Sequence, residues 1–514
     1  MIILYHNNAK ITGIVSTETG DVSDGLNRNI SAVLLDFADK YPNEILVWCH
    51  ESAKDNLNVD AIESLFHHKK VLCSYHPSSN YFDSRLGYIE ASAFVKVNKE
   101  VHYGTWQTSS HFGAVHSSVL RACKADLLIE KDFDYFLNSF AKRAIFFGLF
   151  CYSEPSLLKN KKNISKVVSA NLYTLFKFAK QHYRIRWIFL LFFNLMVFEK
   201  RFPVFPLLVS LFYKRRNFNP DELNTIGITS NRSIIEKGSI DVLIPTIGRK
   251  DYLLNVLENL ASQTHLPTNV IVIEQNPEEN SASQLDFIQN RKWPFTIKHH
   301  FTHQTGACNA RNIGLELIES EFCFFADDDI VFESNLLENA FKSIQFTGNE
   351  VILISCHLKS QTIQPMPPIQ FPIFGGGHSF VKSACLNGLK FNMSYEFGFG
   401  EDGDFGMQLV NKGYDILFIS TNEIIHLKAP IGGFRTKPIL KWSDDVIEPK
   451  PSPTVMLYKL LHETEEQLLS YKTTVFFKNL NNGFFRNPFK YIKTFRQKWN
   501  RSVYWANELK KHQS

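Results

Sequence analysis

The chain has 514 residues, of which 44% are hydrophobic and 21% charged, and its formal net charge is +5. This composition excludes a disordered or fibrous protein, and the length allows two or three domains at roughly 100–200 residues each. The 8 cysteines include no C-x-x-C pair, so we expect reduced core thiols and neither zinc ligands nor disulfides. The N-terminus has neither the basic region nor the cleavage site of a signal peptide, which predicts a cytoplasmic protein.

An aromatic and basic connector at residues 161–235 is expected to follow an N-terminal α/β domain at residues 1–160. Its apolar runs fall short of the ~20 residues that span a bilayer, so no transmembrane helix is predicted. Basic residues flank both runs, namely Arg184, Arg186, Lys200, Arg201, Lys214, Arg215 and Arg216. The pattern favours helices that contact a membrane surface, with a buried connector as the alternative.

Short β-rich runs alternate with helical stretches after residue 236. Strands are predicted at residues 240–246, 269–276 and in "FCFFADDD", and helices at residues 250–263 and 309–320. This order predicts an α/β domain with a mainly parallel sheet flanked by helices. Ligands of such sheets bind beyond the carboxyl ends of the strands, where Asp327, Asp328 and Asp329 are expected. Because three adjacent carboxylates repel one another, a metal ion is the leading candidate for a partner.

Further polar residues and glycines are expected at the same edge of this sheet. Pro245, Thr246 and Arg249 follow the first strand, and Glu274 and Asn276 end the second. Gly306, Ala307, Arg311 and Asn312 open the next helix. Free backbone N–H groups and a guanidinium at the start of that helix could hold a diphosphate. Downstream, three consecutive glycines allow close approach of the backbone, and a Gly-rich loop leads into a helix that begins near Glu401 and Asp402.

The ordered series "IPTIGR", "VIVIEQN", "TGACNARNIGL", "FFADDDI", "GGGHSF", "FGEDGDFGMQL" and "IIH" resembles an inverting family 2 glycosyltransferase of the GT-A fold. The resemblance covers roughly residues 238–435, and its specificity lies in seven elements in the right order, because a D-x-D triplet alone has little weight. Glu274 stands where the family usually has Asp, and Ala326 stands where Leu or Ile is frequent. A GT-A catalytic domain is therefore expected at residues 236–436.

The resemblance implies a role for each site residue. Asp402 is the expected catalytic base and Glu401 its acceptor-binding neighbour, while Asp327, Asp329 and His426 are the expected ligands of Mn²⁺ or Mg²⁺. The expected donor-binding residues are Pro245, Thr246, Arg249, Glu274, Asn276, Gly306, Arg311, Asp327 and Asp328. The expected acceptor loop comprises Gly375, Gly376, Gly377 and His378.

The implied reaction is metal-dependent transfer, with inversion, of a sugar from a nucleotide-diphosphate donor to a glycan or lipid-linked acceptor. A UDP-sugar is the favoured donor, and the expected place is the inner face of the cell membrane during assembly of a cell-surface polysaccharide. The basic and aromatic C-terminal extension at residues 437–514 would contact the membrane and no nucleic acid, or would pack its apolar face on the body of the protein.

The N-terminal region resembles a degenerate GT-A-like half-domain. "EILVWCHES" reads alongside "EFCFFADDD", so that His50, Glu51 and Ser52 replace the acidic triplet, and a constant offset pairs Asp132 with Asp402 and Lys131 with Glu401. Only 43 residues precede the first matched strand, too few for two nucleotide-binding units at roughly 30 residues per βαβ. We expect a remnant that binds no donor; chance similarity of two α/β segments is the alternative.

Two other functions compete with glycosyl transfer. A two-metal nucleotidyltransferase would need further acidic residues at a neighbouring strand end and a Gly-rich phosphate loop, and the sequence has neither. A non-catalytic scaffold built from GT-A-like modules would have no reason to keep both Asp402 and the D-x-D triplet. Glycosyl transfer is therefore the favoured prediction.

Overall fold

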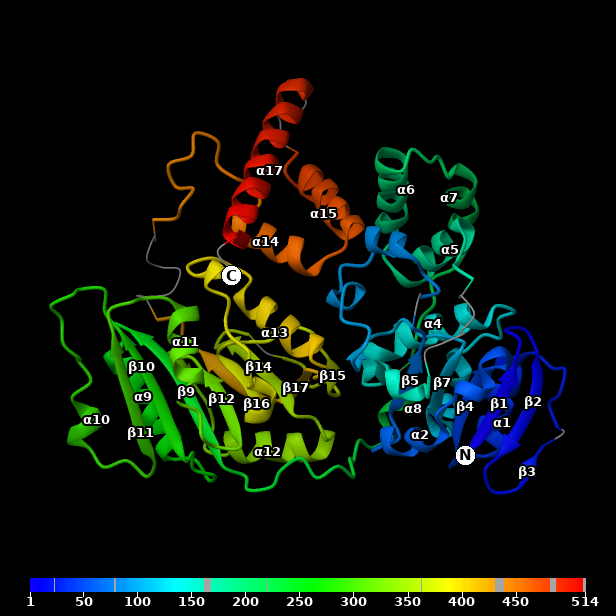
Figure 1. The fold of residues 1–514 in the computed structure, drawn as a ribbon, viewed down its shortest axis with the longest axis horizontal. Coiled ribbons are helices and arrows are strands. Elements are labelled where there is room, and N and C mark those ends of the chain that lie inside the picture. The colour runs from blue at the N-terminus through cyan, green and yellow to red at the C-terminus, as the bar shows by residue number, and fades with distance from the viewer. Residues whose placement is uncertain are drawn as a thin grey trace. The chain divides into compact units, whose positions relative to one another are not determined.

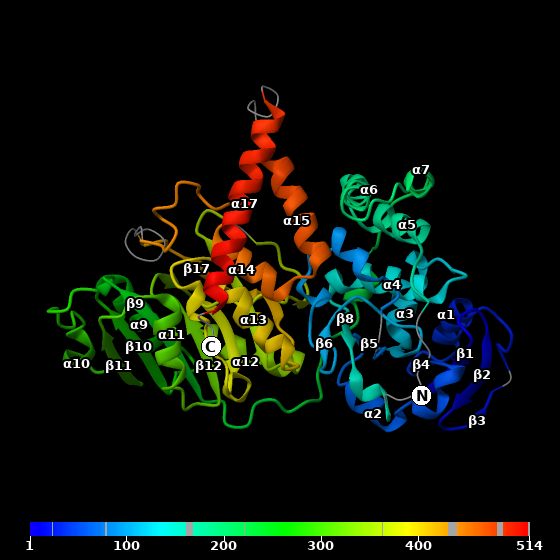
Figure 2. The same cartoon turned by 45° about the horizontal axis from the view of Figure 1, so that its top comes forward.

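The computed structural model describes residues 1–22, 24–77, 80–160, 168–219, 221–361, 363–429, 439–480 and 487–511. The chain forms two compact units (Figures 1 and 2). The first comprises Met1–Arg232, Pro367–Gln370 and Thr464–Thr473, and the second comprises Ser233–Met366, Phe371–Glu463 and Thr474–Ser514. The break after residue 232 lies close to the boundary predicted at residue 236. Residues 161 and 436, where other boundaries are predicted, lie outside the described residues.

The first unit contains an eight-stranded sheet in the order β3-β2-β1-β4-β7-β5-β8-β6. Its strands are β1 (Ile2–His6), β2 (Ile11–Ser16), β3 (Gly20–Asp21), β4 (Ile45–His50), β5 (Val71–Tyr75), β6 (Tyr103–Gly104), β7 (Phe112–His116) and β8 (Phe150–Ser153). Its helices are α1 (Ile30–Lys40), α2 (Val59–Leu65), α3 (Ser117–Cys123), α4 (Phe133–Ala144), α5 (Leu172–His182), α6 (Arg186–Phe198), α7 (Val204–Leu211) and α8 (Asp221–Asn224). The predicted N-terminal α/β fold is confirmed.

The second unit contains a sheet in the order β11-β10-β9-β12-β16-β14-β17-β13. Its strands are β9 (Ile240–Ile247), β10 (Asn269–Gln275), β11 (Thr296–Thr302), β12 (Phe322–Ala326), β13 (Ile330–Val331), β14 (Val351–Leu358), β16 (His378–Lys382) and β17 (Leu417–His426), while the short strand β15 (Ile369–Gln370) lies in a stretch of the first unit. Its helices are α9 (Lys250–Ala261), α10 (Phe287–Asn290), α11 (Ala307–Leu315), α12 (Leu336–Thr347), α13 (Glu401–Asn411), α14 (Pro453–His462) and α17 (Pro488–Lys511), while α15 (Glu465–Lys478) begins in the first unit.

The second sheet follows from its sequence pattern. Every residue of β10 and β12 is buried, as expected of central strands covered on both faces. Helix α9 buries Leu253, Val256, Leu257 and Leu260, an apolar stripe at helical spacing. Strands β10, β9 and β12 run parallel, so their carboxyl ends meet at one edge. The predicted mixed, mainly parallel GT-A sheet is confirmed.

Strand β11 is among the strands of this sheet that the sequence does not predict. Strand β11 pairs with β10 at the end of the sheet order, and α10 precedes it. Its sequence "TIKHHFT" is intermediate or exposed at every position and has no alternation of apolar and polar residues. An edge strand needs only one hydrogen-bonded neighbour, so its sequence signal is weak.

The C-terminal segments pack on the second unit. Helix α17 buries Trp499, Ser502, Ala506 and Leu509 along one face and contacts α14. This agrees with the second of the two alternatives for this segment, a basic helix whose apolar face packs on the body of the protein. Within the described ranges, no helix combines the length and apolar character needed to cross a membrane. All eight cysteines are free thiols, and seven of them are buried, as predicted.

The two sheets share a five-strand arrangement, β1-β4-β7-β5-β8 in the first and β9-β12-β16-β14-β17 in the second. In both, the first two strands are parallel, the third is antiparallel to its neighbours, and the last two are parallel. The predicted structural repeat is therefore present. The first unit has the β2–β3 hairpin where the second has β10 and β11, so its described strands include no counterpart of β10, whose end carries predicted donor-binding residues.

The predicted pairing of Asp132 with Asp402 is wrong by two residues. Asp402 is the second residue of α13, whereas Asp132 lies before α4 and caps it by accepting from the Tyr135 N–H at 3.0 Å. The second residue of α4 is Asp134. Phe133, and not Lys131, therefore stands in the position of Glu401.

Candidate functional site

The acidic triplet follows β12 at the carboxyl edge of the second sheet, and its central residue points inward. Asp328 is 2% exposed and accepts hydrogen bonds from Thr246 Oγ1 at 2.6 Å and Arg249 Nη1 at 2.5 Å. Burial raises the pKa of Asp328 to about 6, against the opposing charge of Arg249. Thr246 and Arg249 thus fix the shape of the turn that presents the two outer carboxylates.

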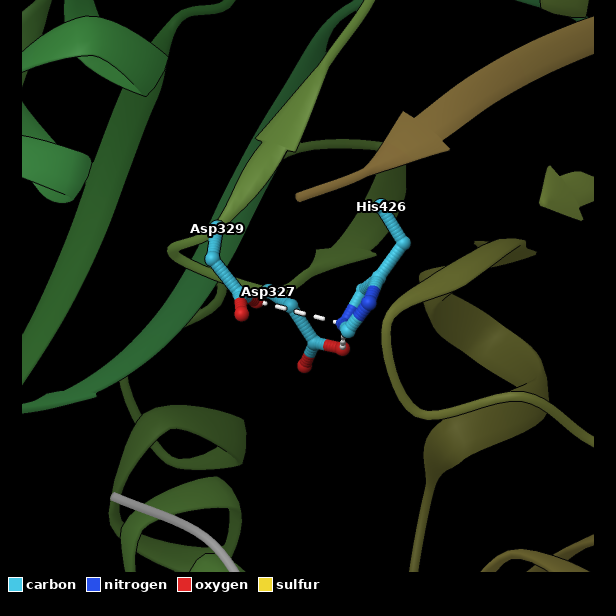
Figure 3. A group of neighbouring side chains, drawn as sticks. All are labelled: Asp327, Asp329 and His426. Carbon is cyan, nitrogen blue, oxygen red and sulfur yellow. Dashed lines mark ion pairs between the residues drawn. The ribbon is translucent and has the colours of Figure 1, made fainter. Parts of the chain in front are cut away.

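The outer carboxylates and a histidine form a group that could hold a metal ion. Asp327, Asp329 and His426 place one ligand atom each within 4.8 Å of one another, and Figure 3 shows their side chains pointing together. His426 Nε2 lies 3.3 Å from Asp329 Oδ1 and 4.0 Å from Asp327 Oδ2. Burial alone would raise the pKa of Asp329, but hydrogen bonds from His426 and from the Ala429 N–H lower it to about 2. Two carboxylate oxygens and one imidazole suit a divalent ion such as Mn²⁺ or Mg²⁺.

The fold brings these three residues together from distant parts of the chain. Asp327 and Asp329 follow β12, and His426 is the last residue of β17, where it pairs with Ile330 of β13. The short β13–β17 ladder therefore holds the histidine beside the triplet. The structure thus brings together the three residues that the sequence predicts as metal ligands.

Three glycines line the opposite wall of the site. A Cβ atom added at Gly376 would lie 2.5 Å from Arg311 Cζ and 2.7 Å from Asp402 Oδ1, and one at Gly377 would lie 2.2 Å from Asp327 Oδ2. A Cβ at Gly375 would lie 2.3 Å from the His378 ring. A side chain at any of these three positions would displace Arg311, Asp402, Asp327 or His378, which lie directly against this backbone.

Helix α13 begins at the site after Gly400, whose φ of 118° lies in the region that favours glycine. Burial raises the pKa of Asp402, while the charge of Arg311 and a hydrogen bond from the Gly376 N–H lower it. Burial and the neighbouring charge of Asp402 raise the pKa of Glu401 to about 7. The start of α13 thus presents two carboxylates that accept a proton more readily than exposed ones.

Arg311 of α11 connects the two halves of the site. Its Nη2 lies 3.6 Å from Asp327 Oδ1 and its Nη1 lies 3.9 Å from Asp402 Oδ1. The guanidinium also lies over the ring of Phe391, 5.4 Å from the centroid. A fixed positive charge is therefore located between the candidate metal ligands and the candidate base.

The expectation of free N–H groups at the start of α11 is wrong. The carboxylate of Glu396 accepts from the N–H groups of Cys308 at 3.2 Å and Asn309 at 2.8 Å, and the Gly306 N–H donates to Gln275 Oε1 at 2.6 Å. A carboxylate at a helix start satisfies unpaired N–H groups and the helix dipole. A diphosphate would have to displace Glu396 to use them.

The remaining predicted donor-binding residues lie along the same edge. Glu274 is buried at the end of β10 and accepts from the Gln284 N–H and His299 Nε2, both at 2.9 Å. Asn276 accepts from the Glu278 N–H at 3.1 Å, and Pro245 lies within β9. These contacts shape the loop after β10, and their role toward a donor stays a prediction.

Two supporting residues have no signal in the sequence. Asp404 is buried in α13 and accepts hydrogen bonds from His462 Nε2 of α14 at 2.7 Å and Gln408 Nε2 at 2.9 Å. Glu396 anchors α11 in the way described above. Both contacts join segments far apart in the chain, so only the structure shows them.

The sheet order and the acidic strand end agree with the GT-A fold that the sequence predicts. The family model of Glycosyl transferase family 2 matches residues 241–402. Glycosyltransferase GlyG of Streptococcus pneumoniae is 22% identical over 22% of this chain and 38% of its own length. An uncharacterized glycosyltransferase of Rickettsia bellii is 26% identical over 22% of this chain and 16% of its own length.

The chain thus spans well under half the length of these curated relatives. Among solved structures, that of S. aureus TarS in complex with UDP has a TM-score of 0.32 and 19% identity, covering 37% of this chain and 61% of that chain. The complex of S. aureus TarS with UDP-GlcNAc has a TM-score of 0.34 and 17% identity, covering 46% of this chain and 70% of that chain.

Proposed function

We propose that the second unit transfers a sugar from a nucleoside-diphosphate donor to a hydroxyl of a glycan or lipid-linked acceptor, with inversion at the anomeric carbon. The observation that carries this proposal is the arrangement of Asp327, Arg311 and Asp402, in which one cation lies between an acidic metal-type group and a carboxylate at a helix start. The match of residues 241–402 to the model of Glycosyl transferase family 2 supports the reaction class.

Asp402 would act as the general base of this reaction. A base must be within reach of the acceptor hydroxyl, and its pKa works best near the operating pH. Burial raises the pKa of Asp402 in that direction, and the nearby charge of Arg311 opposes the rise. Glu401 beside it would bind another acceptor hydroxyl.

Asp327, Asp329 and His426 would hold the divalent ion. When bound, Mn²⁺ or Mg²⁺ would stabilise the negative charge that develops on the leaving diphosphate. The low pKa of Asp329 keeps its carboxylate ionised as a ligand, whereas buried Asp328 is fully engaged by Thr246 and Arg249. Asp328 therefore serves the site as a positioning residue.

The test is release of nucleoside diphosphate from a panel of UDP-, GDP- and dTDP-sugars, with Mn²⁺, with Mg²⁺ and with chelator. We expect metal-dependent turnover of one donor, with a UDP-sugar as the first to try, and loss of turnover in Asp329→Asn and Asp402→Asn. Exposed Glu316→Gln, which changes the residue directly after the helix that carries Arg311, is the matched control. Absence of both turnover and metal-dependent nucleotide binding across the panel would favour the scaffold alternative. The cytoplasmic, membrane-peripheral location stays a prediction.

A further inference from the structure

Helices α6 and α7 of the first unit expose an unusual number of large apolar side chains. We define the α6–α7 surface by its most exposed members, which are Ile185, Phe189, Phe202, Val204, Phe205, Leu208, Val209, Leu211 and Phe212. Phe205 is 72% exposed and Phe212 is 88% exposed. Apolar residues scattered singly are normal on a protein surface, but a contiguous patch marks an interaction site.

The surface exists because each helix uses only a narrow stripe to attach to the unit. Helix α6 is apolar all round, yet only Ile188, Leu191, Asn194 and Leu195 are buried. Helix α7 buries Pro206 and Ser210 alone and contacts α5 and α6. In Figures 1 and 2 the two helices lie side by side beyond α5, at the margin of the unit. Core packing therefore explains one face of the pair and leaves the other side chains exposed among the residues that the structure describes.

Basic residues surround the apolar surface. Residues 171–216 contain nine Lys and Arg and one acid, Glu199. Lys200 and Arg201 lie in the turn between α6 and α7, while Arg184 and Arg186 open α6 and Lys214 and Arg215 follow α7; all six are exposed.

The bases that open α6 and those that follow α7 lie at the same end of the helix pair. Lys180 Nζ donates to the Tyr213 carbonyl at 2.8 Å, and the Arg216 N–H donates to the Gln181 carbonyl at 3.0 Å. These bonds return the chain after α7 to the end of α5, from which α6 starts. Positive charge thus borders the apolar patch at both ends, as anionic headgroups around inserted side chains require.

We propose that the α6–α7 surface docks on an anionic lipid bilayer, with the phenylalanines inserted at the headgroup boundary and the flanking bases on lipid phosphates. Helix α6 has 13 residues, about 20 Å at 1.5 Å per residue, against a hydrocarbon core of about 30 Å. Its length and the exposed bases at both ends fit a helix lying in the interface. A second copy of the chain would cover the apolar patch but would bring the same positive borders together.

The experiment is flotation of the full-length protein with vesicles of phosphatidylglycerol and phosphatidylcholine in equal parts, beside vesicles of phosphatidylcholine alone. One variant is Phe205→Glu/Phe212→Glu, and a second is Lys214→Gln/Arg215→Gln. The matched control is Ile439→Glu/Val446→Glu, which changes two apolar side chains that are 94% and 102% exposed elsewhere in the chain. Thermal unfolding checks that each variant folds, and the assay needs no sugar transfer.

We expect binding to the anionic vesicles that salt weakens, at least a tenfold loss in the phenylalanine variant, and about a fivefold loss for each base removed. The control should bind like the wild type. Equal binding to neutral vesicles, or no binding to either, would overturn the proposal. A dimer in light scattering that the phenylalanine variant dissociates, without lipid binding, would overturn it in favour of a second copy.

Discussion

The two units place different chemistry on the same five strands. The antiparallel ladder that ends at Ala326 and His378 in the second unit ends at Cys49 and Phe112 in the first. The residues that follow each ladder end therefore correspond: His50, Glu51 and Ser52 replace the acidic triplet, and Ser109, Ser110 and His111 replace the three glycines. The fold alone thus does not make the site; the side chains at one sheet edge do.

In the first unit this edge is filled. Ser110 donates to Asp134 through both its N–H and its hydroxyl, each at 2.9 Å, so the carboxylate that corresponds to Asp402 is satisfied within the protein. In the second unit Gly376 has no side chain, and Asp402 Oδ1 has no hydrogen-bond partner among the described residues. An open edge with an unpaired carboxylate oxygen can accept a ligand, whereas the filled edge of the first unit leaves its carboxylate paired within the protein.

Histidines complete the contrast. The ring of His50 stacks on that of His111 at 5.0 Å, and His6 packs against His50 at 5.6 Å. Burial lowers the pKa of His6 to about 3, so its ring is neutral at physiological pH. The first unit thus places histidine rings that pack on one another where the second unit places carboxylates that could hold a metal ion.

The strongest test of the contrast compares Asp402→Asn with Asp134→Asn. We expect the first change to lower kcat by about 10²–10⁴-fold, as loss of a general base does. The second should leave kcat unchanged, because Asp134 is enclosed by its own unit. Nucleoside diphosphate release at saturating donor measures both. A loss of less than tenfold in Asp402→Asn would remove Asp402 from the role of base, and a large loss in Asp134→Asn would give the first unit a part in catalysis.

The variants Gly376→Ala and Ser110→Ala test why the second unit has glycine at the position where the first unit has serine. Gly376→Ala would force Arg311 or Asp402 aside, and a displacement of about 1 Å can lower turnover by ~10²-fold. Ser110→Ala removes one hydrogen bond to a buried carboxylate and should cost about 1–3 kcal/mol of stability without changing kcat. Steady-state kinetics and urea unfolding of both variants separate the effects. Wild-type turnover in Gly376→Ala would show that the glycine is not needed for the site.

Metal dependence is the third difference to examine. His426→Ala removes one of three candidate ligands, and we expect the Mn²⁺ concentration for half-maximal turnover to rise at least ~10–100-fold, the range that weaker perturbations of metal sites produce. Chelator should abolish turnover in the wild type and leave the unfolding of the first unit unchanged. His300→Ala, which changes an exposed histidine of the edge strand β11, is the histidine control. Equal Mn²⁺ dependence in His426→Ala and the wild type would exclude His426 as a ligand.

The sequence predicted the parts of this contrast that depend on local pattern. Strands β9, β10 and β12 and helices α9 and α13 carry clear periodicities, and the acidic triplet directly follows its strand, so each was found within a few residues. Edge strand β11 and the Glu396 contact with α11 were missed, because the first lacks periodicity and the second joins residues 87 positions apart. The repeat was found but was misaligned at Asp132, because identical letters were matched where the helix starts differ by two residues.

Replacing Asp134 by Asn should leave turnover unchanged but should alter how the free energy of unfolding depends on pH. Burial raises the pKa of Asp134 to about 7, while an unfolded Asp titrates near 3.9. Between these values the folded state binds more protons than the unfolded state, so the free energy of unfolding falls as pH rises from about 4 to about 7 and is then constant. Asn keeps an acceptor for the Ser110 N–H and offers a donor to its hydroxyl, as a protonated carboxyl does.

We therefore expect Asp134→Asn to remove this part of the slope and to be more stable than the wild type at about pH 8, by up to a few kcal/mol on the scale of ~1.4 kcal/mol per pKa unit. At about pH 5 the two proteins should differ little. Urea unfolding at both pH values measures the difference in the free energy of unfolding between the variant and the wild type. The contributions of other titrating groups are the same in both proteins and cancel in this difference. Parallel curves would mean that Ser110 holds Asp134 ionised, and that the two units keep the same charge at this position and differ only in what surrounds it.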